Sequence, residues 1–186
     1  MVSVSRSARP GTRREILEAA AGLFAAGGFR GTSLQDIATA VGCSKAALLY
    51  HFDGKDTILS ELLAPAVAAF RELDARLAVL DDRAVRLAAV EGFVDLVLRF
   101  RREVVILYHD IQDLLRSMAF AGVQEMTDRL LDALAGRSPE PEARTAALLV
   151  LGGVPAACAA SGGLEGSGIR GDLVRSAARA LGLPAD

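Results

Sequence analysis

The chain has 186 residues, 52% of them hydrophobic, and a formal net charge of −2 at pH 7. This length can bury a sizeable core, either as one compact unit or as a small domain joined to a larger one, and the charge excludes a histone-like polycation. Cys43 and Cys158 are too few and too far apart to indicate a disulfide framework or a zinc site, so we expect a reducing compartment.

The amino-terminal end is basic. Residues 1–60 carry seven Lys or Arg against five Asp or Glu, whereas residues 61–186 carry fourteen against eighteen. Four arginines precede the first acidic residue: Arg6, Arg9, Arg13 and Arg14. We interpret residues 1–10 as a disordered basic arm, which either solubilises the chain or supplements affinity for DNA. The first ten residues contain no apolar stretch of the kind found in a secretory signal, so we expect a cytoplasmic protein.

A first helix is predicted to begin near Thr12, which has Glu15 three residues on, and to stop at the pair Gly27-Gly28. Its apolar positions recur at helical spacing: Ile16, Leu17, Ala20, Leu23 and Phe24. Residues 34–52 then predict a helix-turn-helix. Their apolar stripe comprises Leu34, Ile37, Ala38 and Val41 before the turn, and Ala47, Leu48 and Phe52 after it.

The expected helix ends support this unit. Ser33 with Asp36 forms a capping pattern, Gly42 can take the left-handed conformation that ends a helix, and Ser44 can open the next helix. Small and hydrogen-bonding side chains on the outer surface suit a helix in the major groove, where base edges and thymine methyls are within reach. The predicted DNA-binding residues are Thr32, Ser33, Ser44, Lys45, Ala46, Ala47, Tyr50 and His51.

The run from Gly28 to Leu59 resembles the DNA-binding domain of TetR-type transcriptional regulators. The resemblance implies a three-helix DNA-binding domain at residues 11–54 and a phosphate contact from Lys55, which opens the fourth helix. The family often has tyrosine directly after the leucine that matches Leu48; this chain has Leu49 there, and Tyr50 follows. We expect Lys45, Tyr50 and Lys55 to contribute to DNA binding and little to folding.

Residues 55–186 keep an apolar period close to 3.6, which predicts an all-α protein of about nine helices. We expect a fourth helix that continues through Pro65, a residue that can kink it, toward Leu80. A new helix is expected after the cap at Asp81-Asp82. The later helices are expected at about residues 83–100, 104–117, 120–136, 142–160 and 169–181, with a linker at residues 136–141. By the same resemblance, residues 55–186 form a helical domain that binds an effector and dimerises.

Aromatic, methionine and histidine side chains in this second region are candidates for an effector pocket, because they make adaptable apolar walls. They are Phe93, Phe100, Tyr108, His109, Gln112, Met118 and Met126, with Glu91 and Asp95 as nearby acidic groups. Each has an ordinary alternative: phenylalanine and methionine at helical spacing are usually core, and a carboxylate is usually solvated. Tyr108 and His109 point about 100° apart on a helix, so at most one of the two is expected to face a cavity. The alternative for His109 is a neutral histidine in the core.

Residues 146–164 carry no charge and approach the length of a membrane span, but glycines and Pro155 interrupt them. Small residues at three- and four-residue steps let helices approach closely, which indicates a homodimer interface or packing within one subunit. We favour the dimer, because a two-fold pair doubles the contacts with DNA. The predicted interface comprises Leu149, Gly152, Gly153, Ala156, Ala157, Ala160, Val174 and Ala178.

The sequence gives little support for an enzyme, a cofactor or a metal site. Gly166, Gly168 and Gly171 match a dinucleotide-binding string, but no strand precedes them, so we interpret the match as accidental. Two histidines, His51 and His109, are too few for a metal cluster or a catalytic triad. The favoured function is a homodimeric repressor released from a palindromic operator by a small molecule. The alternative is an effector-independent architectural or protein-interaction module.

Overall fold

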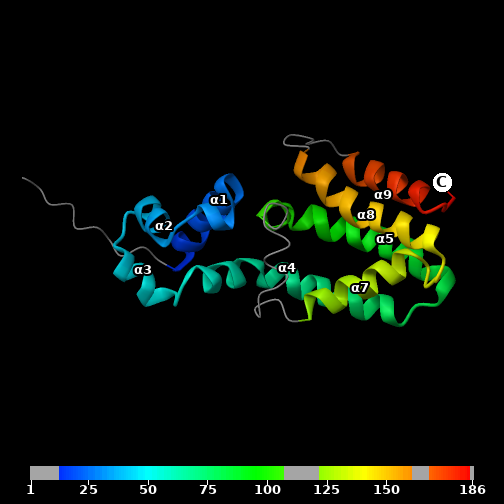
Figure 1. The fold of residues 1–186 in the computed structure, drawn as a ribbon, viewed down its shortest axis with the longest axis horizontal. Coiled ribbons are helices and arrows are strands. Elements are labelled where there is room, and N and C mark those ends of the chain that lie inside the picture. The colour runs from blue at the N-terminus through cyan, green and yellow to red at the C-terminus, as the bar shows by residue number, and fades with distance from the viewer. Residues whose placement is uncertain (1–12, 107–121, 161–167, 185–186) are drawn as a thin grey trace, which may run out of the picture. The chain divides into compact units, whose positions relative to one another are not determined.

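The computed structural model describes residues 13–106, 122–160 and 168–184. Within these ranges the chain forms helices joined by short connections, and no strand occurs there (Figure 1). The helices are α1 (Arg13–Gly31), α2 (Leu34–Val41), α3 (Lys45–His51), α4 (Lys55–Ala78), α5 (Asp82–Arg99), α7 (Val123–Leu134), α8 (Pro141–Ala160) and α9 (Ile169–Ala180). Residues 101–106 are also helical. The predicted all-α class is confirmed.

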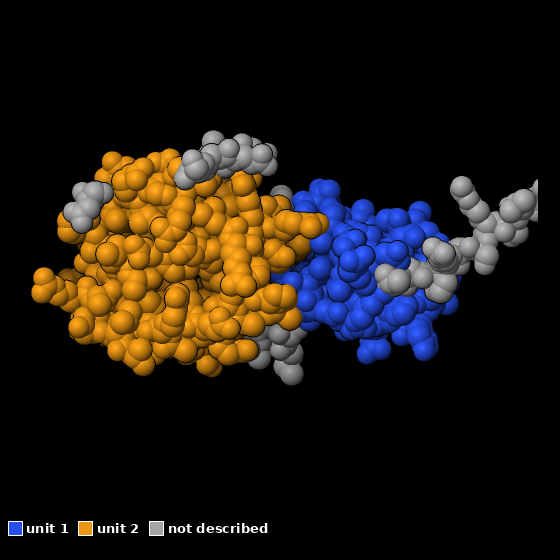
Figure 2. All heavy atoms as spheres, turned by 180° about the vertical axis from the view of Figure 1, so that it is seen from behind, with its two compact units in different colours: residues 1–63 blue, residues 64–186 orange. Residues whose placement is uncertain are grey.

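The chain divides into two compact units, Met1–Leu63 and Ala64–Asp186 (Figure 2). The division falls inside α4, whereas the predicted change of domain lies between residues 54 and 55. The difference has a physical reason. Ile58, Leu59 and Leu63, all in the first part of α4, are almost fully buried, and they supply apolar surface to the first unit.

The first unit has a core drawn from four helices. Its fully or almost fully buried side chains are Ile16, Ala20, Phe24, Ile37, Ala38, Leu48, Phe52, Ile58, Leu59 and Leu63. The rings of Phe24 and Phe29 meet edge to face, with centroids 5.2 Å apart. The predicted stripe of the helix-turn-helix therefore faces inward, although Leu34, Val41 and Ala47 at its margins are only half-buried.

Helix α2 is closed at both ends by its own sequence. The backbone amide of Asp36 donates to the Ser33 hydroxyl (3.1 Å), and the Ser33 amide donates to the Asp36 carboxylate (2.8 Å). Gly42 ends the helix in the left-handed region, with φ of 77°. Both predictions are confirmed. Hydrogen bonds from the Ser33 hydroxyl and amide lower the pKa of Asp36. The cap therefore stabilises the fold fully at pH values above the ordinary pKa of Asp, and this stabilisation is lost as the pH falls through the lowered pKa.

Helix α1 breaks at its predicted end. Gly28 has φ of 74° and ψ of 161°, outside the helical region, and residues 29–31 then form a further turn. A residue with a side chain rarely adopts such a positive φ, so glycine is the suitable residue at this position. At the break, the carbonyl of Gly28 accepts a hydrogen bond from the Thr32 hydroxyl (2.9 Å), and the carbonyl of Phe29 accepts one from Lys55.

The second unit is a helical bundle with α5 at its centre. Helix α5 contacts α7, α8 and α9, and its side chains Val85, Ala89, Val90 and Val94 are fully buried. A helix buried on several sides occupies the middle of a bundle rather than its surface. Gly92 allows a close approach to α4, because a Cβ added there would lie 2.4 Å from Leu73 Cδ1.

Where the structure describes them, the predicted helix ends in the second unit agree with it within a few residues. The predicted end near residue 117 lies outside the described residues. Asp81 caps α5, its carboxylate accepting hydrogen bonds from the amides of Arg83 (3.0 Å) and Ala84 (2.8 Å). Pro65 lies inside α4, as expected. The predicted linker begins at Gly136, which has φ of 69° and is followed by Arg137 with φ of 55°.

Candidate nucleic-acid interface

Helix α3 presents a short face of exposed side chains. Lys45 and Ala46 are exposed in its first turn, and Tyr50 is 87% exposed near its end. Leu48, between them, is fully buried and fixes which side of the helix faces inward. Leu49, the residue that departs from the family pattern, is 41% exposed. The outer face of α3 thus combines a cation, an aromatic ring and small or apolar groups, a mixture that can contact phosphates and base edges.

Other predicted DNA-binding residues have roles within the first unit. The Ser44 hydroxyl accepts a hydrogen bond from the Ala47 amide (3.1 Å) and so caps α3, while Ala47 itself is half-buried. His51 is half-buried, with its ring edge-on to Tyr50. Thr32 is 4% exposed, and its hydroxyl donates to the carbonyl of Gly28 (2.9 Å). A direct base contact by these groups remains a prediction.

Lys55 is held by backbone carbonyls of the first unit. Its Nζ donates to the carbonyls of Phe29 (2.5 Å) and Thr32 (2.8 Å), and it lies 4.3 Å from the centre of the Phe29 ring. The sequence did not indicate these contacts, because their partners lie more than twenty residues earlier in the chain. The phosphate contact expected of Lys55 stays a prediction, and a structural role is added to it.

Replacing Lys55 by Ala is therefore expected to lower the free energy of unfolding by about 1–3 kcal/mol, since it leaves two partly buried carbonyls without their charged donor. The matched control is Lys45→Ala, which removes the same charge from an exposed position and should change stability by less than about 0.5 kcal/mol. Urea unfolding followed by circular dichroism measures both. Equal stability of the two variants would contradict a structural role for Lys55.

The candidate effector residues are only partly described. Phe93 and Met126 are buried, Phe93 within the main apolar cluster of the second unit, and Phe100 is half-buried. Glu91 and Asp95 are exposed, as a solvated face requires, and Asp95 forms an ion pair with Arg170. Four further candidates lie outside the described residues: Tyr108, His109, Gln112 and Met118. The same holds for the basic arm at residues 1–10 and for Gly166.

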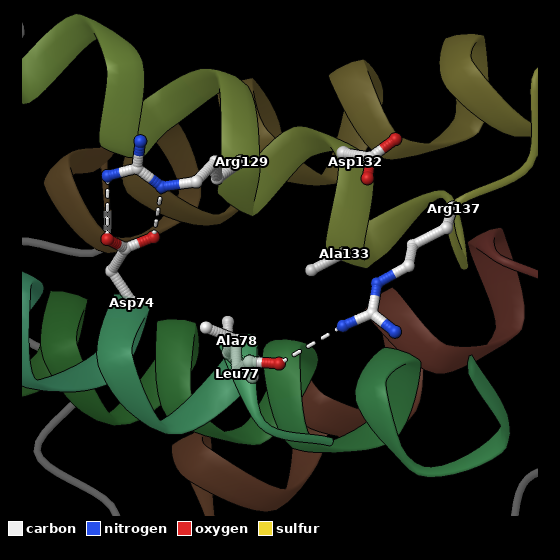
Figure 3. A pocket seen from close by; sticks show the side chains of 7 residues that line it. All are labelled: Asp74, Leu77, Ala78, Arg129, Asp132, Ala133 and Arg137. Atoms are coloured by element: carbon white, nitrogen blue, oxygen red, sulfur yellow. Dashed lines mark hydrogen bonds and ion pairs between the residues drawn. The ribbon is translucent and has the colours of Figure 1, made fainter. Parts of the chain in front are cut away.

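A small recess lies elsewhere on the second unit (Figure 3). It has a volume of about 110 Å³ and is lined by Asp74, Leu77, Ala78, Arg129, Asp132, Ala133 and Arg137. Figure 3 shows that its arginines are already engaged: Arg129 donates two hydrogen bonds to Asp74, and Arg137 donates to the Leu77 carbonyl (3.3 Å). No candidate effector residue lines this recess. Among the described residues, no three or more His, Cys, Asp or Glu gather as metal ligands would.

The predicted interface on α8 forms an exposed stripe. Leu149 is 68% exposed, and Gly152, Gly153, Ala157 and Ala160 are exposed at the following turns. By length and composition α8 could cross a membrane, and 22% of its most apolar window is buried within the chain. Of the remaining predicted interface residues, Ala156 and Val174 are half-buried, whereas Ala178 is 4% exposed and already packed by its own chain.

Comparison with known proteins places these features in context. Residues 16–62 match the model for bacterial regulatory proteins of the tetR family. The HTH-type transcriptional repressor KstR2 of Rhodococcus jostii (strain RHA1) is 32% identical over 124 residues, which cover 64% of this chain and 60% of the relative. The chain therefore aligns with less than two thirds of that protein's length.

Two solved structures share the fold over almost the whole chain. A TetR-family transcriptional regulator from Bordetella parapertussis 12822 has a TM-score of 0.72 at 25% identity, covering 92% of this chain and 94% of its own. Mycobacterium smegmatis AmtR has a TM-score of 0.69 at 26% identity, covering 96% and 90%. The likeness thus extends from the helix-turn-helix into the second unit.

Proposed function

We propose that this chain, which belongs to the TetR family of bacterial regulatory proteins, is a transcriptional repressor that binds double-stranded DNA through α3. The observation that carries the proposal is the division of α3 into two faces. Leu48 anchors the helix in the core, and Lys45, Ala46 and Tyr50 are left exposed on a helix of the size that enters a major groove. The relative from Rhodococcus jostii is named as a repressor of the same helix-turn-helix type.

The repressor is proposed to act as a homodimer through α8 and α9. Much of the apolar surface of α8 is not covered by its own chain, and Leu148 and Leu149 are 54% and 68% exposed. A Cβ added at Gly152 or Gly153 would meet nothing within 4 Å, so packing within the chain does not require glycine at either position. A second copy that approaches closely along this stripe accounts for both observations.

The effector is proposed to be a small, largely apolar molecule bound by the second unit. The size of that unit supports this role, because residues 64–186 exceed what a pair of dimerising helices needs. Binding would favour a subunit arrangement in which the two α3 helices no longer fit successive major grooves, which lie about 34–36 Å apart. We further propose a cytoplasmic location and no enzymatic activity, consistent with relatives that are transcriptional regulators.

The function is tested by incubating the purified protein with random genomic fragments and sequencing those it retains. A repressor should enrich a two-fold symmetric site and bind it at least about 1000-fold more tightly than a scrambled duplex. A panel of apolar small molecules is then screened for a rise in melting temperature, because a ligand that binds only the folded state stabilises it. Enrichment of no sequence would contradict the repressor. An enriched site without any stabilising or operator-releasing ligand would favour the architectural alternative.

A further inference from the structure

Arg13, the first residue of α1, is engaged in four contacts with later parts of the first unit. Its Nε donates to Glu61 Oε1 at 2.9 Å, and its Nη2 donates to the other carboxylate oxygen of Glu61. Its Nη1 donates to the backbone carbonyl of His51 at 2.6 Å. The guanidinium carbon also lies 4.3 Å from the centre of the Phe52 ring. In the sequence Arg13 is one of four arginines that precede the first acidic residue, and the structure places it in this cluster.

The contacts converge on the end of α3. His51 is the last residue of that helix, and its carbonyl is one of the terminal acceptors that a helix cannot satisfy by itself. Phe52, which follows, is 2% exposed. Arg13 thus joins the end of α3 to Glu61 on α4 through a planar group whose donors suit a carboxylate and a carbonyl together. The hydrogen bonds that Arg13 donates to Glu61 raise the pKa of Arg13, so the group stays charged.

We propose that Arg13 and Glu61 are positioning residues for operator recognition. They fix the orientation of α3 in the first unit, so that the exposed face carrying Lys45 and Tyr50 meets base edges in the correct register. The inference rests on the proposed function, because it concerns how α3 is presented to DNA. Direct readout depends on donor and acceptor geometry, whereas contacts with phosphates tolerate small rotations. Loss of the Arg13–Glu61 pair should therefore weaken discrimination more than general affinity.

Arg13 could instead contact a DNA phosphate. The two roles predict opposite effects on DNA affinity when the charge of its partner Glu61 is removed. The side chains of Arg13 and Glu61 are 49% and 34% exposed, so both charges are accessible to solvent. If Arg13 acted on phosphate, removing the negative charge of Glu61 would leave Arg13 unpaired and strengthen binding to any duplex. If the pair positions α3, the same change weakens binding to the operator only.

The experiment compares the full-length parent protein with Arg13→Lys, Glu61→Gln and the double variant, using the selected operator and a scrambled duplex at two salt concentrations. Each single variant should lose about tenfold in operator affinity, the size of one lost base contact, with binding to the scrambled duplex unchanged. The double variant should be no worse than either single, because both changes break one interaction. The slope of affinity against salt should stay that of the parent.

The matched control is Glu18→Gln. Glu18 lies 3.8 Å from Arg14 on the surface of α1, with side chains 63% and 84% exposed, so this change removes the same charge near the same helix end without touching α3. It should bind both duplexes like the parent. Melting temperatures identify loss of folded protein, which would lower operator and scrambled binding in proportion and leave their ratio unchanged.

Tighter binding of Glu61→Gln to both duplexes would overturn the proposal, because it would assign Arg13 to phosphate. Operator discrimination equal to that of the parent in all three variants would overturn it as well. So would a loss of operator affinity that is fully explained by a smaller fraction of folded protein. Failure of the parent itself to prefer any selected duplex would instead contradict the proposed repressor function, so the two ideas fail in distinguishable ways.

Discussion

Replacing Gly153 by Arg should convert the proposed homodimer to a monomer and lower operator affinity by more than about 100-fold, because two linked half-sites become independent. The chain itself can accommodate the change, since a Cβ at this position meets nothing within 4 Å. In the proposed interface, however, the guanidinium would be buried against the apolar stripe of α8 without a partner, which costs about 3–5 kcal/mol.

Light scattering measures the mass, and titration with the operator measures the affinity. The control is Ala75→Arg, which adds the same charge at an exposed position of α4. This control variant should remain a dimer and bind the operator like the parent. A dimeric Gly153→Arg protein with the operator affinity of the parent would remove α8 from the interface.

A second large effect is expected from substitutions at two nearby residues of α3, one of which should lower stability and the other DNA binding. Leu48→Ala should lower the free energy of unfolding by about 2–5 kcal/mol, because it leaves a cavity at a fully buried site in a small domain. Tyr50→Ala should change stability by less than about 0.5 kcal/mol, since this side chain is 87% exposed, and should weaken DNA binding instead.

Denaturant unfolding and operator titration of both variants separate the two effects. Because the chain has two compact units, the unfolding of each should be followed separately, for instance by circular dichroism over two transitions. If Tyr50→Ala binds the operator as tightly as the parent, the exposed face of α3 is not the recognition surface. If Leu48→Ala is as stable as the parent, the core assignment of α3 is wrong.

The sequence predicted best where structure is decided locally. Ser33, Asp36, Gly42 and Ser44 act on backbone groups within four residues of themselves, so their roles follow from spacing alone. The same is true of Asp81 at the start of α5. Helical periodicity likewise gave the buried face of the helix-turn-helix, because core positions on short helices repeat at fixed steps.

Contacts between distant segments were not predictable in this way. Arg13 meets Glu61 and the carbonyl of His51 across 48 and 38 residues, and Lys55 meets the carbonyls of Phe29 and Thr32 across 26 and 23 residues. A basic residue near a chain end carries no sequence signal for such a partner. The proposed effector site belongs to the same class, since a pocket is assembled from several helices whose packing the periodicity does not specify.

The place where the chain divides, inside α4, decides where its first unit can be joined to the second unit of a related protein. A chimaera cut after Gly54, where the sequence motif ends, would discard Lys55, Glu61 and the buried side chains of Ile58, Leu59 and Leu63. Pro65, just beyond the division, has no amide hydrogen to donate to the carbonyl of Glu61, so one backbone hydrogen bond of α4 is already missing there. When the first unit is exchanged between such proteins, the junction should therefore lie at residues 63–65, where one backbone hydrogen bond of α4 is already missing.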